Sequence, residues 1–255
     1  MAEKWIGVVG GVGPFAGIDL LGKIAAQTVA NQDQDHLTVL NWSQPAKVVD
    51  RTEYLLGEVE ENPAVALAAQ VQQLAKMGAG VVGIPCNTAH APRIFNQIRA
   101  ELAAANCDVT LLHMIEEVGR FLQTHLPEVT QVGVLSTTGT YRAGVYVDVL
   151  GELGFTAVLP PLTLQTEKIH PAIYDPEYGI KACGVATAEA KANLQEGIVT
   201  LKTAGAEAII LGCTELPLAF TKPTAAGLPL IDPTLILARA LIREANPTKS
   251  KEVIE

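Results

Sequence analysis

Short apolar runs alternate with longer amphipathic stretches along the chain. The apolar runs predict buried strands, and the stretches with an apolar residue every three or four positions predict helices. The predicted strands lie at residues 5–9, 37–42, 109–112, 131–135, 156–159 and 229–231, and in the runs that end at Cys86 and Cys213. The predicted helices lie at residues 14–29, 63–77, 91–104, 116–125, 141–153, 186–203 and 233–245. Regular alternation of this kind favours parallel sheets covered by helices.

Three polar segments interrupt the alternation. Residues 43–52 are expected to form an irregular loop, and residues 136–140 a polar turn. Residues 163–184 contain Pro171 and Pro176, which break a continuous helix, so we expect a loop with short helical pieces.

The sequence also contains an internal repeat, which indicates two related halves. Residues 205–215 align without a gap on residues 78–88, and each segment begins at the glycine that ends a Leu-x-x-x-Gly run. We therefore predict an α/β fold of two pseudo-symmetric, doubly wound parallel-sheet domains with the active site in the cleft between them. The predicted first domain contains residues 1–115 and 219–255, with the segment from Ala219 returning to pack on the first half. The predicted second domain contains residues 116–218.

Each repeat contains a cysteine, Cys86 or Cys213, at the carboxyl end of a predicted strand, where open α/β sheets bind ligands. Asn87 and Thr88 are good N-cap residues for the following helix, and a thiol at a helix N-terminus has a lowered pKa. The alternative for Cys86 alone is a buried structural cysteine beside a helix cap. The second copy of the motif favours a chemical role.

Composition narrows the possible functions. Apolar residues make up 49% of the 255 positions and aromatic residues 5%, which suits an aliphatic α/β core. The net charge of −9 argues against nonspecific binding of nucleic acid. The four cysteines show no C-x-x-C spacing, so neither a zinc site nor a disulfide scaffold is expected. The sequence has no 18-residue apolar run and does not begin like a signal peptide, so we expect a reduced, cytoplasmic protein without a membrane span.

Two thiols that face each other across a cleft can act on opposite faces of one carbon atom. One thiolate removes a proton while the other thiol returns a proton to the opposite face, and the stereocentre is inverted. An amino-acid α-proton is a weak acid, so donors must stabilise the carbanion. Groups that could donate hydrogen bonds follow the predicted strands: the side chains of Asn87, Thr88 and Thr214, and the turn formed by Thr137, Thr138, Gly139 and Thr140.

These motifs resemble those of the aspartate/glutamate racemase superfamily. The similar segments are residues 10–14 (Gly-Gly-Val-Gly-Pro), 50–52 (Asp-Arg-Thr), 85–90 (Pro-Cys-Asn-Thr-Ala-His), 137–140 and 212–215 (Gly-Cys-Thr-Glu). The Asp-Arg-Thr segment, and glutamate in place of histidine after Cys213-Thr214, point to the aspartate racemase branch. The resemblance extends from about residue 5 to residue 240 and therefore spans nearly the whole chain.

The resemblance implies a racemase that interconverts L- and D-aspartate without pyridoxal phosphate, metal or other cofactor. It implies Cys86 and Cys213 as the two proton donor/acceptors, and Arg51 as the partner of the distal carboxylate. Asn87, Thr88, Thr214 and the 137–140 turn would surround the α-carboxylate and the amino group. Lys181 is implied as a second distal cation, although Cys183 stands where a small residue is commoner, so Lys168 is the alternative. A homodimer is also implied.

The sequence is also compatible with other functions. Some alternatives keep the fold and change the reaction: a glutamate or broad-specificity racemase, a maleate isomerase, a hydantoin racemase or a malonate decarboxylase. A non-enzymatic alternative is a binding protein for acidic amino acids, in which neither thiol reacts. A dinucleotide fingerprint at residues 11–16 is opposed by the lack of an acidic residue at the end of the second strand. Glu215 either orients its neighbouring thiol or caps a turn. His90 is expected to pack in the interior rather than to act as a base. No chemical role is expected for Cys107, Cys183 or Asp19.

Overall fold

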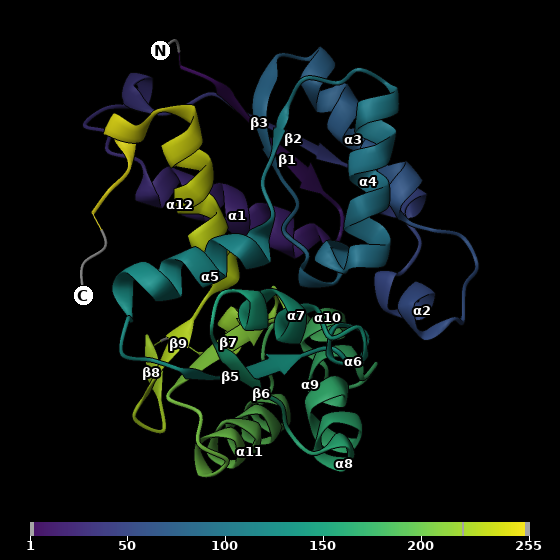
Figure 1. Cartoon of the computed structure of the whole chain (residues 1–255), viewed down its shortest axis with the longest axis vertical. Coiled ribbons are helices and arrows are strands. Elements are labelled where there is room, and N and C mark those ends of the chain that lie inside the picture. Colours follow the sequence, from purple (N-terminus) through teal and green to yellow (C-terminus); the bar gives the residue numbers. More distant parts are fainter. Residues whose placement is uncertain (1–2, 221, 253–255) are drawn as a thin grey trace.

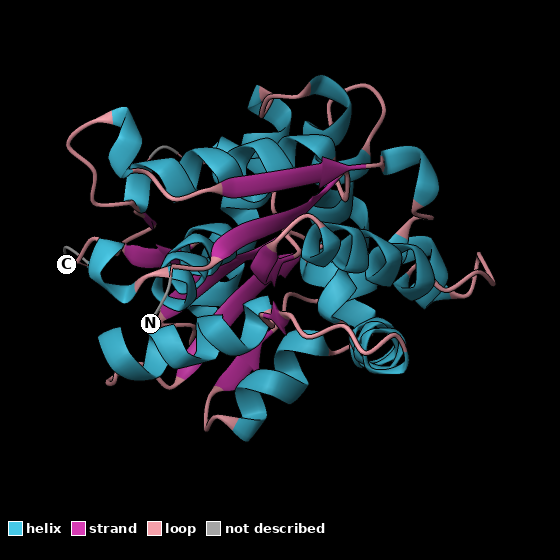
Figure 2. Cartoon of the chain, turned by 90° about the horizontal axis from the view of Figure 1, so that it is seen from above, coloured by secondary structure: helices cyan, strands magenta, loops and turns pink. Residues whose placement is uncertain are grey.

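Two lobes, each built around its own sheet, make up the protein in a computed structural model that describes residues 3–220 and 222–252 (Figure 1). The first sheet has the strand order β2-β1-β3-β4, and the second has the order β6-β5-β7-β9-β8. Helices cover the sheets in layers, which a view from above shows clearly (Figure 2). The prediction of an α/β fold with parallel sheets in two lobes is confirmed.

The elements follow the predicted alternation closely. The strands are β1 (Trp5–Gly10), β2 (Val39–Ser43), β3 (Ala79–Gly83), β4 (Thr110–Leu111), β5 (Gln131–Ser136), β6 (Thr156–Val158), β7 (Ala208–Gly212), β8 (Thr224–Ala225) and β9 (Leu228–Ile231). The helices are α1 (Pro14–Gln27), α2 (Arg51–Leu56), α3 (Ala64–Lys76), α4 (Pro92–Ala104), α5 (Met114–His125), α6 (Thr138–Arg142), α7 (Val145–Glu152), α8 (Leu162–Leu164), α9 (His170–Tyr174), α10 (Ile180–Cys183), α11 (Ala188–Thr203) and α12 (Pro233–Ala245).

The first sheet is buried on both faces because its strands carry aliphatic side chains at successive positions. Ile6 and Val8 of β1 point toward α1 and α12, where they pack with Leu20 and Leu241. On the opposite face, side chains of β1 and β3 pack with α3 and α4. All four strands are parallel, so their carboxyl ends meet at one edge.

The second sheet is covered in the same way. One face packs on α5 and α7, and the other packs on α9 and α11. β5, β6, β7 and β9 are parallel, and β8 pairs with β9 in the antiparallel direction. The orders β2-β1-β3 and β6-β5-β7 correspond, and β3 and β7, which precede the two motif cysteines, each lie next to the first strand of their half. The internal repeat of the sequence therefore has a counterpart in the topology.

The chain crosses between the lobes twice. α5 lies between the two sheets, and α12 leads from β9 back to the first lobe, where it packs on α1 (Figure 1). The division into domains at residues 115/116 and 218/219 stays a prediction. Within it, α12 packs on the first lobe as expected, whereas strand pairing places residues 224–231 in the second sheet.

Two local expectations were wrong. Asp50 does not lie in an irregular loop but caps α2, since its carboxylate accepts hydrogen bonds from the backbone N–H groups of Thr52 and Glu53. The predicted polar turn 136–140 and helix 141–153 are instead two helices: α6 begins at Thr138, inside the predicted turn, and α7 begins after Gly144, whose left-handed conformation with φ of 65° separates the two. In the part of the chain that the structure describes, no helix has both the length and the apolar character needed to cross a bilayer.

Candidate active site

Both motif cysteines line one small cavity between the lobes. Cys86 lies just beyond the carboxyl end of β3, and Cys213 directly follows β7. Each thiol residue is only 6% exposed. The other residues that line the cavity are Val12, Arg51, Asn87, Thr88, Thr137, Tyr174, Lys181, Thr214 and Glu215.

The cavity is nearly closed, with a free volume of about 10 Å³. That volume holds roughly one water molecule. Its walls come from both lobes, so an amino acid fits only after some of these residues move.

The turn after Cys86 differs from the expected helix cap. Asn87–His90 form a single 3₁₀ turn, and α4 begins only at Pro92. Neither Asn87 nor Thr88 caps α4, so both side chains are left for other contacts. Nδ1 of His90 lies 2.9 Å from the carbonyl oxygen of Cys86 and donates to it, which ties the thiol-bearing turn to a buried ring.

Asn87 is oriented by a tyrosine from the other lobe. The hydroxyl group of Tyr146 donates to Oδ1 of Asn87 across 2.5 Å. Burial raises the pKa of Tyr146 well above its usual value, so the hydroxyl group keeps its proton. Among the described residues, Nδ2 of Asn87 has no hydrogen-bond partner although it is buried. Asn87 therefore offers an N–H donor at the cavity.

Threonine hydroxyl groups join the two lobes beside the cavity. The Oγ1 atoms of Thr88 and Thr140 lie 2.9 Å apart, and those of Thr52 and Thr137 lie 3.4 Å apart. Thr137 also caps α6 through the backbone N–H of Thr140. A Cβ atom at Gly139 would lie 2.7 Å from Oγ1 of Thr52, so glycine at this position allows the lobes to approach.

Cys213 belongs to a buried chain of polar contacts. Its Sγ atom donates to Oε2 of Glu215 across 3.0 Å. The hydroxyl group of Thr214 donates to the same oxygen atom across 3.1 Å. On the other side of the carboxylate, Nζ of Lys181 lies 2.7 Å from Oε1, and a Cβ atom at Gly13 would lie 3.2 Å from that oxygen. The glycine-rich turn after β1 therefore lies against the Lys181–Glu215 ion pair.

The pKa of Cys213 is shifted opposite to the direction expected for a thiol at a helix N-terminus. Burial raises it well above the usual value, and the negative charge of Glu215 raises it further, while Lys181 opposes the shift. Burial alone would raise the pKa of Glu215, but the charge of Lys181 and the hydrogen bonds from Cys213, Lys181 and Thr214 together outweigh it and lower the pKa. Cys213 is therefore held as a thiol, ready to donate a proton, with an ionised carboxylate beside it.

The opposite thiol faces a cation instead. Arg51, the first residue of α2, is 9% exposed and lines the cavity with Cys86. Burial acts to lower the pKa of Arg51, but its interactions with Cys86 and Asp50 outweigh burial and raise the pKa, so the arginine stays charged. One of its NH1 hydrogen atoms is donated to the carbonyl group of Val49, 3.3 Å away. The two thiols thus have different surroundings, with Arg51 near Cys86 and the Lys181–Glu215 ion pair near Cys213.

The remaining predicted residues lie around this centre. Thr138, Gly139 and Thr140 are buried in α6 but do not line the cavity. Lys168, the alternative to Lys181, pairs with Glu196 at the surface. Cys107 and Cys183 are free and lie outside the cavity.

Other features of the site could not be read from the sequence. Tyr174 lines the cavity, and its hydroxyl group donates to the carboxylate of Asp50, 3.2 Å away. Tyr146 acts on Asn87 from 59 positions further along the chain. Tyr174 lies within the proline-broken segment 163–184, and Tyr146 has the spacing of an ordinary core residue, so no local pattern marks either of them.

A buried pair of histidines next to the Cys86 turn makes stability depend on pH. Burial lowers the pKa of His90 to about 3 and that of His113 to about 4. Both are neutral in the folded protein, whereas the unfolded chain binds protons below about pH 6.5. Folding therefore loses stability as the pH falls from about 6.5 toward these values, by about 2 kcal/mol for each histidine at pH 5.

The variant His113→Asn tests this dependence. Asparagine can still cap α5 but does not titrate, so the loss in unfolding free energy between pH 7.5 and pH 5 should shrink by about 2 kcal/mol. Urea unfolding at both pH values measures the loss, and His36→Asn, at an exposed position, is the control. An unchanged pH dependence in His113→Asn would contradict the assignment.

Comparison with known proteins agrees with this geometry. The family model described as Asp/Glu/hydantoin racemase matches residues 9–241. The chain belongs to this racemase family. The match covers both cysteines, strands of both sheets and most of α12.

Solved structures show the same fold as this racemase-family chain. An aspartate racemase from Picrophilus torridus is 26% identical with a TM-score of 0.76, over 98% of this chain and 96% of that one. An aspartate racemase homologue from Pyrococcus horikoshii is 24% identical with a TM-score of 0.70, over 95% and 99%. A glutamate racemase from Francisella tularensis, in complex with D-glutamate, is 16% identical with a TM-score of 0.68, over 99% and 86%.

Proposed function

We propose that this protein is a cofactor-independent racemase that interconverts L- and D-aspartate by two-base proton transfer between Cys86 and Cys213. The observation that carries the proposal is that both strand-end thiols line one cavity, with Arg51 beside Cys86 and the Lys181–Glu215 ion pair beside Cys213. One sulfur removes the α-proton, and the other returns a proton to the opposite face. Neither a decarboxylase nor a binding protein would require two thiols in one cavity.

The donors around the cavity suggest how the substrate is held. In this proposal, Nδ2 of Asn87 and the hydroxyl groups of Thr88 and Thr214 contact the α-carboxylate and the amino group. Asn87 is buried with an unpaired donor, which supports a ligand-binding role. Thr137 lies in the same wall. For Thr138, Gly139 and Thr140 a supporting role is proposed, in which they position Thr88 and Thr52.

Arg51 and Lys181 are the cations proposed for the distal carboxylate. Arg51 is the stronger candidate, because Lys181 already pairs with Glu215, which leaves only part of its donor capacity. Arginine also binds a carboxylate with two parallel hydrogen bonds. Aspartate is favoured over glutamate because the aspartate racemase from Picrophilus torridus has the highest identity among the three structures described, 26%. One methylene group gives only about 1–3 kcal/mol of discrimination, so glutamate racemisation is the alternative.

Chiral chromatography of the amino acid after incubation with the purified protein tests the proposal. L-aspartate should yield D-aspartate, and D-aspartate should yield L-aspartate, without added cofactor. If glutamate is racemised faster than aspartate, glutamate becomes the proposed substrate. If neither amino acid is racemised, the proposed function is wrong.

Arg51→Ala is expected to lower kcat/KM for aspartate about 100-fold, mainly through KM, because a charged hydrogen bond to a carboxylate is lost. Asp50 would still cap α2, so the melting temperature should change little. Steady-state kinetics and thermal unfolding measure the two effects. Arg93→Ala, on α4 outside the cavity, is the control. An unchanged kcat/KM for aspartate in Arg51→Ala would refute the assigned role.

Two further expectations stay proposals. A homodimer is consistent with the exposed side chains of Phe15, Ile18 and Leu218, which line an apolar cavity of about 240 Å³ that also includes Glu215. Light scattering of the purified protein tests this state. The cytoplasmic setting would keep both thiols reduced, as the proposed chemistry requires.

A further inference from the structure

A second and much larger cavity lies between α5 and α12. Its volume is about 310 Å³, and residues of the segment after α12 complete its wall. None of the proposed catalytic residues lines it. α5 and α12 are the helices that cross between the lobes, so a molecule bound here would contact both crossings (Figure 1).

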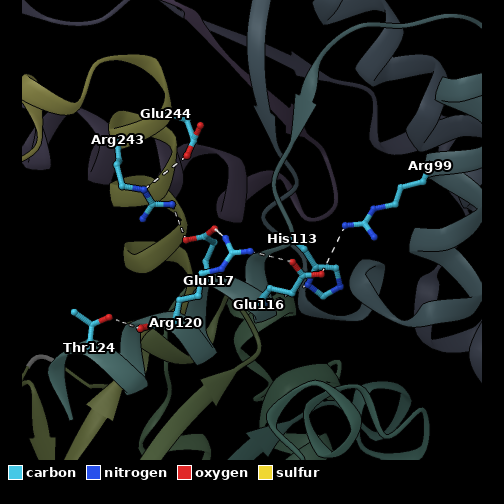
Figure 3. A network of polar contacts seen from close by, with 8 residues as sticks. All are labelled: Arg99, His113, Glu116, Glu117, Arg120, Thr124, Arg243 and Glu244. Atoms are coloured by element: carbon cyan, nitrogen blue, oxygen red, sulfur yellow. Dashed lines mark hydrogen bonds and ion pairs between the residues drawn. The ribbon is translucent and has the colours of Figure 1, made fainter. Parts of the chain in front are cut away.

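A buried carboxylate joins the two helices at this cavity. Glu117 of α5 is 2% exposed and forms ion pairs with Arg120 of the same helix and with Arg243 of α12 (Figure 3). The carboxylate of Glu117 therefore contacts two guanidinium groups, and each of these has a second, longer ion pair, Arg120 with Glu116 and Arg243 with Glu244. Each guanidinium group has five N–H donors, and the two arginine side chains are 58% and 48% exposed, so donors remain for another acceptor.

Two further cations of the wall bind only neutral groups. Nε of Arg239 donates to Oε1 of Gln27 across 2.9 Å, and Nζ of Lys251 donates to the carbonyl oxygen of Ala26 across 2.7 Å. Within residues 3–220 and 222–252, neither side chain lies within ion-pair distance of a carboxylate. Burial lowers the pKa of Arg239, which indicates incomplete compensation of its charge.

The wall therefore combines excess positive charge with an apolar surface. Among the described residues it holds four cationic side chains and the carboxylate of Glu117, in a chain whose net charge is −9. Glu116 and Glu244 also pair with Arg120 and Arg243, at 3.6 and 3.8 Å, so the excess positive charge comes from Arg239 and Lys251. Phe121, Ile236 and Ala240 supply apolar contacts between these groups. Such a combination suits a molecule that has an anionic group at one end and an apolar body at the other.

We propose that this cavity is a binding site for a small organic anion, in which a phosphate or carboxylate group contacts Arg239, Arg243 and Lys251 while the apolar part lies on Phe121. The site differs from the proposed racemase site in its residues and in its ligand. Its occupancy does not depend on the proposed function.

Isothermal titration calorimetry of the full chain with phenyl phosphate tests the proposal. Phenyl phosphate should bind saturably and more tightly than inorganic phosphate, benzyl alcohol should not bind, and the affinity should fall as NaCl is added. Arg51→Ala should leave the affinity unchanged, which distinguishes this cavity from the cationic groups of the racemase site.

Arg239→Gln and Lys251→Gln locate the binding. Each should weaken phenyl phosphate at least 10-fold, whereas Lys191→Gln, at an exposed position of α11, should not. Lys251 is exposed, so its variant remains informative if Arg239→Gln is unstable. No saturable binding of phenyl phosphate, or equal affinity in Lys251→Gln and Lys191→Gln, would overturn the proposal.

Discussion

Replacing either Cys86 or Cys213 with alanine is expected to reduce racemisation of aspartate at least about 1,000-fold. Each thiol is the only proposed proton donor/acceptor on its face of the substrate, and general acid–base catalysis contributes about 100- to 10,000-fold. Both residues are buried beside the same cavity, and alanine removes the sulfur without adding bulk. Chiral chromatography of aspartate measures the loss in each variant.

The chain offers a matched control for this experiment. Cys107 is also a free cysteine of the first lobe, but it lies outside the cavity. Cys107→Ala should racemise aspartate at the wild-type rate. Each catalytic variant should retain exchange of the α-proton with solvent on one face, because one thiol remains. Racemisation at the wild-type rate in Cys86→Ala or Cys213→Ala would contradict the two-base mechanism.

Glu215→Gln is expected to lower kcat/KM for aspartate about 100-fold at pH 8, which lies within the range that proton-transfer groups contribute. The carboxylate accepts the S–H hydrogen bond of Cys213 and balances the charge of Lys181. Glutamine keeps the shape and removes the charge, so Lys181 acts on the thiol without opposition. The pKa of Cys213 should fall, because one of the two causes that raise it is gone.

The direction of the pH effect distinguishes this role from a structural one. In the direction where Cys213 donates its proton, the alkaline limb of kcat/KM should move to lower pH in Glu215→Gln. The pH dependence of Cys213 alkylation by iodoacetamide, followed by mass spectrometry, should move the same way. Glu196→Gln is the matched control, since Glu196 pairs with Lys168 at the surface. A lower rate with an unshifted pH profile would indicate only a structural role for Glu215.

The sequence predicts most of the fold because the signals are local. The apolar strands and the proline and glycine positions indicate α1, α3 and α4 nearly to the residue, and Asp232 caps α12 as Asp232-Pro233 suggests. The repeat of residues 78–88 and 205–215 places both cysteines at equivalent strand ends, and the parallel topology then brings them to one cavity.

Features that depend on distant contacts were not predictable in this way. β9 joins the second sheet through pairing with β7, which no pattern in residues 228–231 specifies. The raised pKa of Cys213 results from its burial and from Glu215, whereas the strand-to-helix position suggested a lowered one. The start of α2 did have a local signal, since Asp50 followed three positions later by Glu53 is typical of a helix N-terminus.

The most direct test of the proposed reaction is proton NMR of L-aspartate in D₂O with the purified protein and no added cofactor. The two-thiol mechanism predicts that the α-proton signal disappears while D-aspartate labelled with deuterium accumulates, because the proton removed on one face is replaced from solvent on the other. An α-proton signal that persists with L-aspartate, D-aspartate and both enantiomers of glutamate would contradict racemisation of acidic amino acids by this protein.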